Sequence, residues 1–227
     1  MAQGKFIVID GTDGSGKATQ TKLLVAKLTQ NNYPVKMIDF PQYGKKCAGL
    51  VEEYLNGVYG QANEVGPYRA SIFYACDRYA ASSQLKEWLE AGNIVISNRY
   101  VSSNMGHQAG KIDDLIERDK FLEWLFELEY KIFGIPKPDV NILLYLPPEI
   151  GQQLVDKKGS RDYVGGQKRD IHEADLQHLI NAAQAYKYVA EKYNWTTINC
   201  APDNELMSIE KIHDLLWTEI QAVLNKD

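Results

Sequence analysis

The chain has 227 residues, 44% of them hydrophobic, and its formal net charge at pH 7 is −5. This length suits a single α/β domain with a buried core, and the acidic balance argues against a nonspecific nucleic-acid binder. We expect no membrane association, because there is no signal peptide pattern and no apolar run of membrane-spanning length. The three dispersed cysteines argue against a disulfide framework and a zinc site, so the reduced cytoplasm is the expected compartment.

Short apolar stretches alternate with helical patterns along the whole chain. The expected strands are Lys5–Asp10, Val35–Phe40, Asn93–Asn98, Asp139–Leu146 and Trp195–Cys200. The expected helices are Lys17–Asn31, Pro67–Glu90, Lys111–Phe133, His172–Tyr193 and Met207–Leu224. This alternation predicts an α/β fold of three layers, α/β/α, around a five-stranded parallel sheet, with ligands at the carboxyl ends of the strands. No repeat and no long linker interrupts the pattern, so residues 1–227 are predicted to form one domain.

The stretch "IDGTDGSGKATQ" lies between the first expected strand and the first expected helix. Gly11, Gly16 and Lys17 fit the phosphate-loop pattern G-x-x-x-x-G-K-[ST], but Ala18 occupies the hydroxyl position and Thr19 comes one residue late. Glycines there let backbone N–H groups surround a phosphate, while the helix N-terminus and Lys17 add positive charge. Ala18 lacks the hydroxyl that usually holds Mg²⁺. The context still favours a phosphate site over a simple turn.

Several polar residues are candidates for the same edge of the sheet. Asp13 lies inside the glycine loop, where it either caps the following helix or meets a hydroxyl or a metal ion. Tyr74 and Arg78 share one helix face, suited to stacking on and bonding a planar base, although a core aromatic and a surface arginine would give the same pattern. Arg99 directly follows a strand, where bidentate phosphate binding is possible. His107, without an acidic or cysteine neighbour in sequence, is expected to act sterically or as a hydrogen-bonding group.

Five motifs together resemble the thymidylate kinase family of P-loop nucleoside-monophosphate kinases: "GTDGSGKATQ", "DFPQYG", "FYACDRY", "NRYVSSN" and "SRDYVGGQKRDIHEADLQ". The resemblance extends over nearly the whole chain. It implies Mg²⁺-dependent transfer of the γ-phosphoryl group of ATP to dTMP, giving dTDP and ADP, in a homodimer. Phosphoryl transfer of this kind depends on alignment of the two substrates and on stabilisation of negative charge on the transferred group.

The resemblance also implies roles for individual residues. ATP would be bound by Gly11, Gly14, Ser15, Gly16, Lys17, Ala18 and Thr19. dTMP would be bound by Asp13, Phe40, Tyr43, Tyr74, Arg78, Arg99, Asn104 and His107. Among these, Tyr74 would stack on thymine, and Arg78 and Asn104 would form hydrogen bonds with its polar edge. Arg99 would hold the acceptor phosphate. Asp13 would meet the sugar 3′-hydroxyl and is the implied metal ligand, and His107 would crowd the 2′ position of the sugar.

Two features distinguish this chain from common family patterns. Asn98 stands where relatives usually have an acid, which together with Ala18 leaves few ligands for Mg²⁺. Gly14 stands where some relatives have an arginine in the loop, so the catalytic cation is expected from a lid at about 156–171 instead. Arg161 is the predicted lid cation, acting with Lys17 and Arg99 as the catalytic set.

Other assignments remain open from sequence. The basic loop "KKGSRDYVGGQKRD" also contains Lys157 and Arg169, which would support Arg161. The adenine pocket is expected near Ile198–Glu210. A broader deoxynucleoside-monophosphate kinase acting on dUMP or others is an alternative function, because one methyl group contributes only about 1–3 kcal/mol of discrimination. A non-catalytic nucleotide-binding protein is a further alternative, suggested by Ala18 and Asn98.

Overall fold

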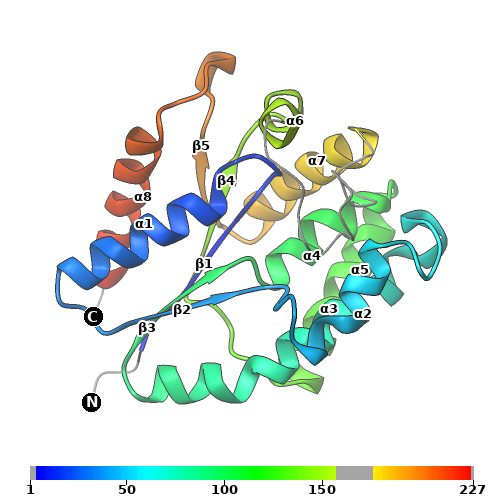
Figure 1. Cartoon of the computed structure of the whole chain (residues 1–227). Coiled ribbons are helices and arrows are strands. Elements are labelled where there is room, and N and C mark those ends of the chain that lie inside the picture. The colour runs from blue at the N-terminus through cyan, green and yellow to red at the C-terminus, as the bar shows by residue number, and fades with distance from the viewer. Residues whose placement is uncertain (1–3, 157–175, 226–227) are drawn as a thin grey trace.

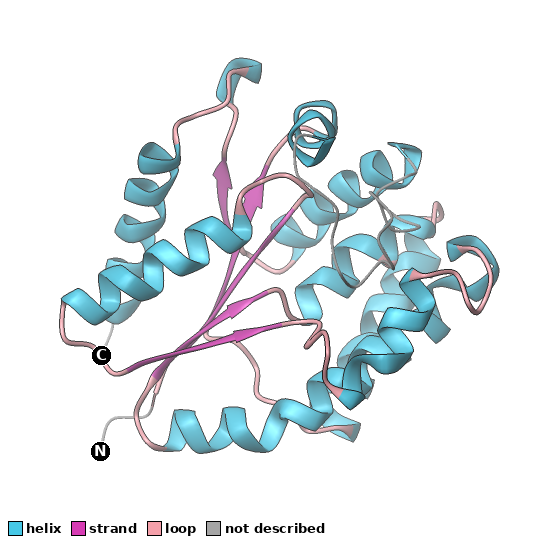
Figure 2. Cartoon of the chain, in the orientation of Figure 1, coloured by secondary structure: helices cyan, strands magenta, loops and turns pink. Residues whose placement is uncertain are grey.

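The computed structural model describes residues 4–156 and 176–225. Five strands form one parallel sheet in the order β2-β3-β1-β4-β5 (Figures 1 and 2). The strands are β1 (Phe6–Gly11), β2 (Val35–Asp39), β3 (Ile94–Asn98), β4 (Val140–Tyr145) and β5 (Thr196–Asn199). The predicted fold class and all five predicted strands are therefore confirmed.

Eight α-helices are present in the described part of the chain. They are α1 (Lys17–Gln30), α2 (Gly49–Leu55), α3 (Ala62–Glu90), α4 (Val101–His107), α5 (Leu115–Phe126), α6 (Pro148–Asp156), α7 (Leu176–Lys192) and α8 (Ile209–Leu224). A π-helical turn, Glu127–Ile132, continues α5, and 3₁₀ turns lie at Lys46–Ala48, Ala109–Lys111 and Pro202–Asn204. None of the helices in the described ranges is long and apolar enough to span a membrane.

The sheet separates two apolar cores, because successive side chains of a strand point to opposite faces. In β1, Ile7 and Ile9 pack with α1 and α8 on one face, whereas Phe6 and Val8 face α3, α4, α5 and α7 on the other. Figure 1 shows these two helical layers on either side of the sheet. Burial on both faces accounts for the near-continuous apolar strands of the sequence. The polar residues that end β1 and β3 are left at the carboxyl edge of the sheet.

The helix boundaries differ from the predicted ones at identifiable residues. The predicted helix Lys111–Phe133 is wrong at its start, because residues 112–114 are not helical and α5 begins at Leu115, where Asp114 Oδ1 accepts a hydrogen bond from Glu117 N at 2.9 Å. The predicted start of the long helix at Pro67 marks a kink within α3, since Gly66 has φ 74° and ψ 168°.

Three short helices were not predicted, namely α2, α4 and α6. Each has nine residues or fewer, so an amphipathic period hardly repeats within it. Helix α4 begins two residues after Arg99 and carries several side chains of the site described below. The predicted lid at about 156–171 lies almost entirely outside the described residues, and so does the start of the helix expected at His172.

Candidate active site

The glycine loop curves from the end of β1 into α1 as the sequence predicts. Gly14 and Gly16 have φ values of 81° and 83°, a left-handed conformation that favours glycine. A Cβ at Gly14 would lie 2.4 Å from the carbonyl oxygen of Gly151 in α6, so the loop also needs glycine for space. Thr12 Oγ1 donates to the carbonyl oxygen of Leu146 at 2.8 Å and accepts from its N–H at 3.0 Å. The loop is thereby fixed to the end of β4.

Lys17 directs its ammonium group back into the loop. Its Nζ donates to the carbonyl oxygens of Gly11 at 2.9 Å and Thr12 at 2.8 Å, and lies 3.8 Å from Asp13 Oδ1. The preceding residue, Gly16, supplies no side-chain cap to α1, and the first turn of the helix has no acidic residue. Positive charge from Lys17 and from the helix N-terminus therefore coincides at the loop, as an anion site requires.

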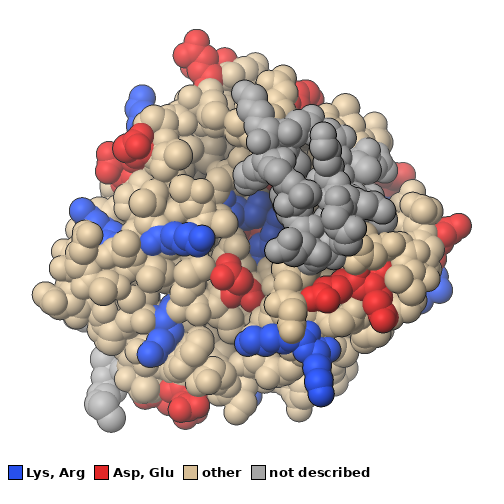
Figure 3. All heavy atoms as spheres, viewed as in Figure 1, with Lys and Arg blue, Asp and Glu red and all other residues tan. Residues whose placement is uncertain are grey.

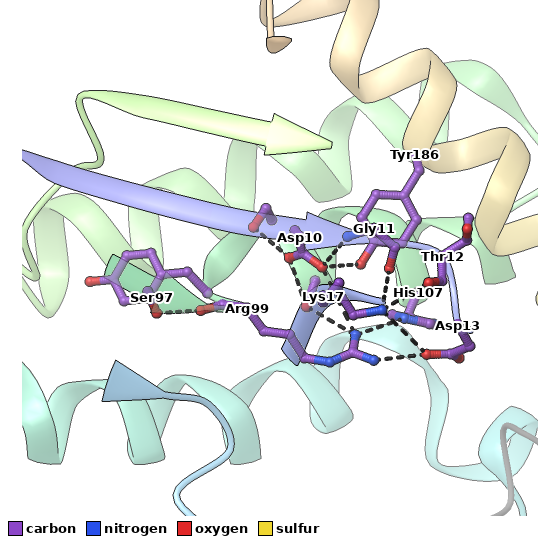
Figure 4. Close-up of polar contacts among 12 residues, drawn as sticks. Asp10, Gly11, Thr12, Asp13, Lys17, Ser97, Arg99, His107 and Tyr186 are labelled. Carbon is purple, nitrogen blue, oxygen red and sulfur yellow. Dashed lines mark hydrogen bonds and ion pairs between the residues drawn. The ribbon is translucent and has the colours of Figure 1, made fainter. Parts of the chain in front are cut away.

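Arg99 faces this loop from the end of β3. Its φ of 68° is unusual for a residue with a side chain, and Ser97 Oγ stabilises the turn by donating to the Arg99 carbonyl oxygen at 2.6 Å. The guanidinium donates to Asp13 Oδ1 at 2.8 Å and to Ser103 Oγ at 3.3 Å (Figure 4). Neighbouring β1 and β3 in the sheet bring these residues together, since Ile9 and Asn98 are register partners.

A buried carboxylate beneath the loop connects three elements, and sequence reasoning missed it. Asp10 accepts hydrogen bonds from the hydroxyls of Ser102 at 2.6 Å, Ser103 at 2.8 Å and Tyr186 at 2.8 Å (Figure 4). It also lies 3.9 Å from Arg99 Nη1. Burial, followed by the adjacent Asp10, raises the pKa of Tyr186 well above its usual value, so the phenol remains a donor. Asp10 thus fixes α4 and α7 relative to the glycine loop.

The charges in this cluster control which groups are ionised. Burial alone would raise the pKa of Asp13, but the positive charges of Arg99 and Lys17 outweigh it and hold that pKa well below its usual value. Burial, and then repulsion by Arg99, lowers the pKa of His107 from 6.5 to about 3, against the opposing effect of Asp13. Arg99 Nη1 lies 3.3 Å from His107 Nε2 and can only donate, so a neutral imidazole with its lone pair on Nε2 fits this contact.

A cavity of about 430 Å³ opens beside the loop, and cationic side chains are visible at the floor of a hollow in Figure 3. Twelve of the predicted site residues line the cavity: Asp13, Gly14, Gly16, Lys17, Ala18, Phe40, Tyr43, Tyr74, Arg78, Arg99, Asn104 and His107. Three predicted ATP-loop residues do not line it, Gly11, Ser15 and Thr19. The cavity therefore brings together the predicted dTMP site more completely than the predicted ATP site. Arg161 lies outside the described residues.

The part of the cavity lining that α3 and α4 supply has the features of a base pocket. Tyr74 and Arg78 line it from α3, as their shared helix face predicts. Asn104 Nδ2 and Gln108 Oε1 are buried there without a hydrogen-bond partner among the described residues. A buried donor and a buried acceptor left unpaired suit the polar edge of a ligand. Gln108 was not among the predicted site residues, and the polar run of α4 was the only signal for it.

Oxygen atoms suitable for a divalent cation are few but present. Asn98 Oδ1 is buried without a hydrogen-bond partner in the described ranges, and it lines the cavity with Asp13 and Ala18. No group of three or more His, Cys, Asp or Glu residues in the described part of the chain could hold a metal ion by itself. A sparse set of oxygen ligands is compatible with Mg²⁺, which keeps several waters, and does not suit a zinc site.

A glycine loop, a buried lysine and an arginine at the end of the neighbouring strand, around one cavity on a parallel sheet, define a P-loop kinase of the nucleoside-monophosphate type. The thymidylate kinase family model matches residues 9–212. The chain therefore belongs to the thymidylate kinase family, whose reaction is phosphorylation of dTMP by ATP. The expectation drawn from the five motifs is confirmed.

Individual relatives agree with this family. Thymidylate kinase from Mycobacterium tuberculosis is 30% identical over 79% of this chain and 84% of the relative. A probable thymidylate kinase from Thermococcus kodakarensis is 34% identical over 98% of this chain and 100% of the relative. The solved structure of the Candida albicans thymidylate kinase superposes with a TM-score of 0.77 at 24% identity, covering 100% of this chain and 95% of that chain, and supports the fold.

Proposed function

We propose that this chain catalyses Mg²⁺-dependent transfer of the γ-phosphoryl group of ATP to dTMP through a site formed by the glycine loop, Arg99 and the base pocket. The observation that carries the proposal is the cavity itself, which Lys17 and Arg99 line from the glycine loop and the end of β3, and Tyr74, Arg78 and Asn104 line from α3 and α4. A molecule with a phosphate at one end and a planar polar base at the other matches this distribution of groups. dTMP has that form, and family membership favours it over other nucleotides.

Arg99 would bind the acceptor phosphate and Lys17 the phosphates of ATP. Both are cations at the carboxyl edge of the sheet, and in the described structure both lie near Asp13. Alignment of two anionic phosphates needs these charges, because phosphoryl transfer depends mainly on positioning and on stabilisation of negative charge. A base is not required, since the attacking atom is a phosphate oxygen that is already ionised.

Tyr74 would stack on thymine, with Arg78, Asn104 and the additional residue Gln108 at its polar edge. Phe40 and Tyr43 line the cavity from the segment after β2 and would enclose the nucleotide. This arrangement leaves acceptor and donor groups for a pyrimidine edge while the aromatic side chain covers its face.

Mg²⁺ would be held by Asp13 and Asn98 together with water and the substrate phosphates. The unpartnered Asn98 Oδ1 and the ionised Asp13 carboxylate supply oxygen ligands of the kind that Mg²⁺ prefers. When bound, the ion would neutralise charge on the phosphates during transfer.

Arg161 is the proposed lid cation, and Lys157 and Arg169 would support it. The support for a lid comes from the elements on either side of this segment. Gly151 in α6 approaches the loop closely at Gly14, and Tyr186 in α7 bonds Asp10. Closure over the site would exclude water as a competing acceptor.

We further propose a cytoplasmic homodimer. The dimer is supported by the apolar exposure of α3, where Tyr68, Ile72 and Tyr79 are 41%, 41% and 55% exposed, and a reducing compartment is compatible with three cysteines that form no disulfide. Sedimentation analysis would test the dimer directly.

The deciding experiment is steady-state ADP release with ATP and Mg²⁺, comparing dTMP, dUMP, dCMP, dGMP and no acceptor. Turnover greatest with dTMP would support the proposal. Comparable turnover with several monophosphates would indicate the broader kinase; broad substrate specificity is stated for the Candida albicans relative. Binding of ATP and dTMP without dTDP formation would contradict catalysis and indicate a non-catalytic nucleotide-binding protein.

A further inference from the structure

A fully buried glutamate lies behind the base pocket and has no part in the chemistry described above. Glu129 is 0% exposed and belongs to the π-helical turn that continues α5. Its partner is Arg78, which is 2% exposed and lines the cavity. Arginine and glutamate side chains are rarely this deeply buried. When they are, each needs an oppositely charged partner, because an unpaired buried charge is strongly destabilising.

The contacts of Arg78 fix its guanidinium in one plane. Nε donates to Glu129 Oε1 at 3.0 Å, Nη2 donates to the same oxygen, and Nη1 donates to the carbonyl oxygen of Tyr100 at 3.3 Å. These contacts use three of the five N–H groups of the side chain, leaving one on Nη1 and one on Nη2. Those two N–H groups are what Arg78 can offer to a ligand in the cavity.

Glu129 occupies a position where the helix pattern calls for an apolar residue. Leu122, Leu125 and Glu129 follow at spacings of three and four, so they share one helix face, and both leucines are fully buried. The next turn winds as a π-helix, a rare form that frequently occurs at functional sites. A carboxylate at a core position, in a rare helix form and directly against a pocket residue, indicates a role beyond packing.

We propose that Glu129 is a positioning residue for recognition of the nucleotide base: it orients the guanidinium of Arg78 and cancels its charge. The proposal rests on the proposed binding of dTMP in this cavity. With Glu129 in place, Arg78 presents two oriented donors, and the pair of side chains carries no net charge. A neutral base with a carbonyl oxygen is then preferred at Arg78 to a phosphate, which is left to Lys17 and Arg99. Cytosine has an amino group in place of that carbonyl. Because the amino group is itself a hydrogen-bond donor, it would face the N–H donors of Arg78 without an acceptor between them.

The test compares Glu129→Gln with Glu127→Gln in the full-length protein. Glu127 lies on the same π-helical turn, is about half exposed and pairs with Lys131, so its variant is the matched control. For Glu129→Gln we expect KM for dTMP to rise about tenfold or more, the scale of one charge-assisted hydrogen bond. KM for ATP should not change, and the preference for dTMP over dCMP should fall. Glu127→Gln should behave as the wild type in all three measurements.

Two outcomes would overturn the inference without affecting the proposed function. One is a folded Glu129→Gln protein with wild-type KM for dTMP and wild-type preference over dCMP. The other is an equal rise in both KM values, which would indicate a general structural role. A wild-type protein that does not turn over dTMP would instead contradict the proposed function.

A second set of variants covers the case in which Glu129→Gln does not fold. Replacing both partners, Arg78→Met with Glu129→Met, removes the buried pair without leaving one charge unpaired. If the buried pair orients donors toward the base, the double variant should show a raised KM for dTMP, an unchanged KM for ATP and a reduced preference for dTMP over dCMP. A folded double variant with the wild-type KM for dTMP would refute the inference.

Discussion

Replacement of His107 by glutamine should reduce the sensitivity of the protein to mild acid. His107 is neutral in the folded state because burial, and then Arg99, lowers its pKa from 6.5 to about 3. Protonation would place a second cation 3.3 Å from Arg99 Nη1 and remove the lone pair that accepts from it. In the unfolded chain the same imidazole has an ordinary pKa and takes up a proton near pH 6.5.

The sign and size of the effect follow from these two values. Between them, the unfolded state binds a proton that the folded state does not, so stability falls as pH falls through 6.5 by about 1.4 kcal/mol per pH unit. From pH 7 to pH 5 His107 alone should lower the free energy of unfolding by about 2 kcal/mol. Asp13 does not interfere in this window, because its stabilising ion pairs are lost only below its ordinary pKa of 3.8.

The assay is urea denaturation followed by tryptophan fluorescence at pH 7, 6 and 5, with EDTA present. Between pH 7 and pH 5 the wild type should lose about 2 kcal/mol more of its free energy of unfolding than His107→Gln, since the variant lacks the titrating group. His213→Gln, in α8 on the opposite layer, reports the contribution of another partly buried histidine. Identical pH dependence of the wild type and His107→Gln would refute the reasoning.

Three further substitutions test the phosphate end of the site. Ala18→Ser adds a hydroxyl at the first turn of α1, so the Mg²⁺ concentration for half-maximal activity should fall; an unchanged Mg²⁺ titration would mean that this position does not face the ion. Arg99→Met should raise KM for dTMP about 100-fold or more and leave KM for ATP unchanged, as measured by steady-state kinetics, because charge-assisted hydrogen bonds to the acceptor are lost. Gly14→Ala places a Cβ 2.4 Å from the Gly151 carbonyl oxygen at a φ of 81°, so thermal denaturation should show a loss of about 1–3 kcal/mol. An unchanged melting temperature would mean that α6 moves away without cost.

Local sequence patterns were sufficient for the sheet and for the centre of the phosphate site. Five apolar stretches became five parallel strands, and the glycine loop follows β1. Arg99 was expected at the sheet edge beside that loop, and its guanidinium lies 2.8 Å from Asp13 Oδ1. These predictions succeeded because residues that end parallel strands meet at one edge, whatever the intervening helices contain.

Contacts between distant segments could not be predicted in the same way. Tyr186 bonds Asp10 across 176 positions, and Glu129 pairs with Arg78 across 51. In the sequence, Asp10 is only the last residue of the expected strand Lys5–Asp10, and nothing nearby indicates its hydrogen-bond partners. Glu129 carried a weak signal, since it follows Leu125 at helical spacing on a core-facing stripe. A carboxylate at a core-facing position indicates a buried partner, but the partner can be identified as Arg78 only when the packing against α3 is known.

The partners of Asp13 connect acceptor binding to metal binding in the proposed mechanism. In the described structure its carboxylate accepts from Arg99 at 2.8 Å, and burial and charge keep it ionised. An acceptor phosphate offers Arg99 a second anion with bidentate geometry, which weakens its hold on Asp13. The carboxylate would then be available to the sugar hydroxyl and to Mg²⁺, beside the unpartnered oxygen of Asn98. In the proposed mechanism, arrival of the acceptor phosphate would therefore help Asp13 and Asn98 to hold Mg²⁺ in a site that lacks the usual hydroxyl at Ala18.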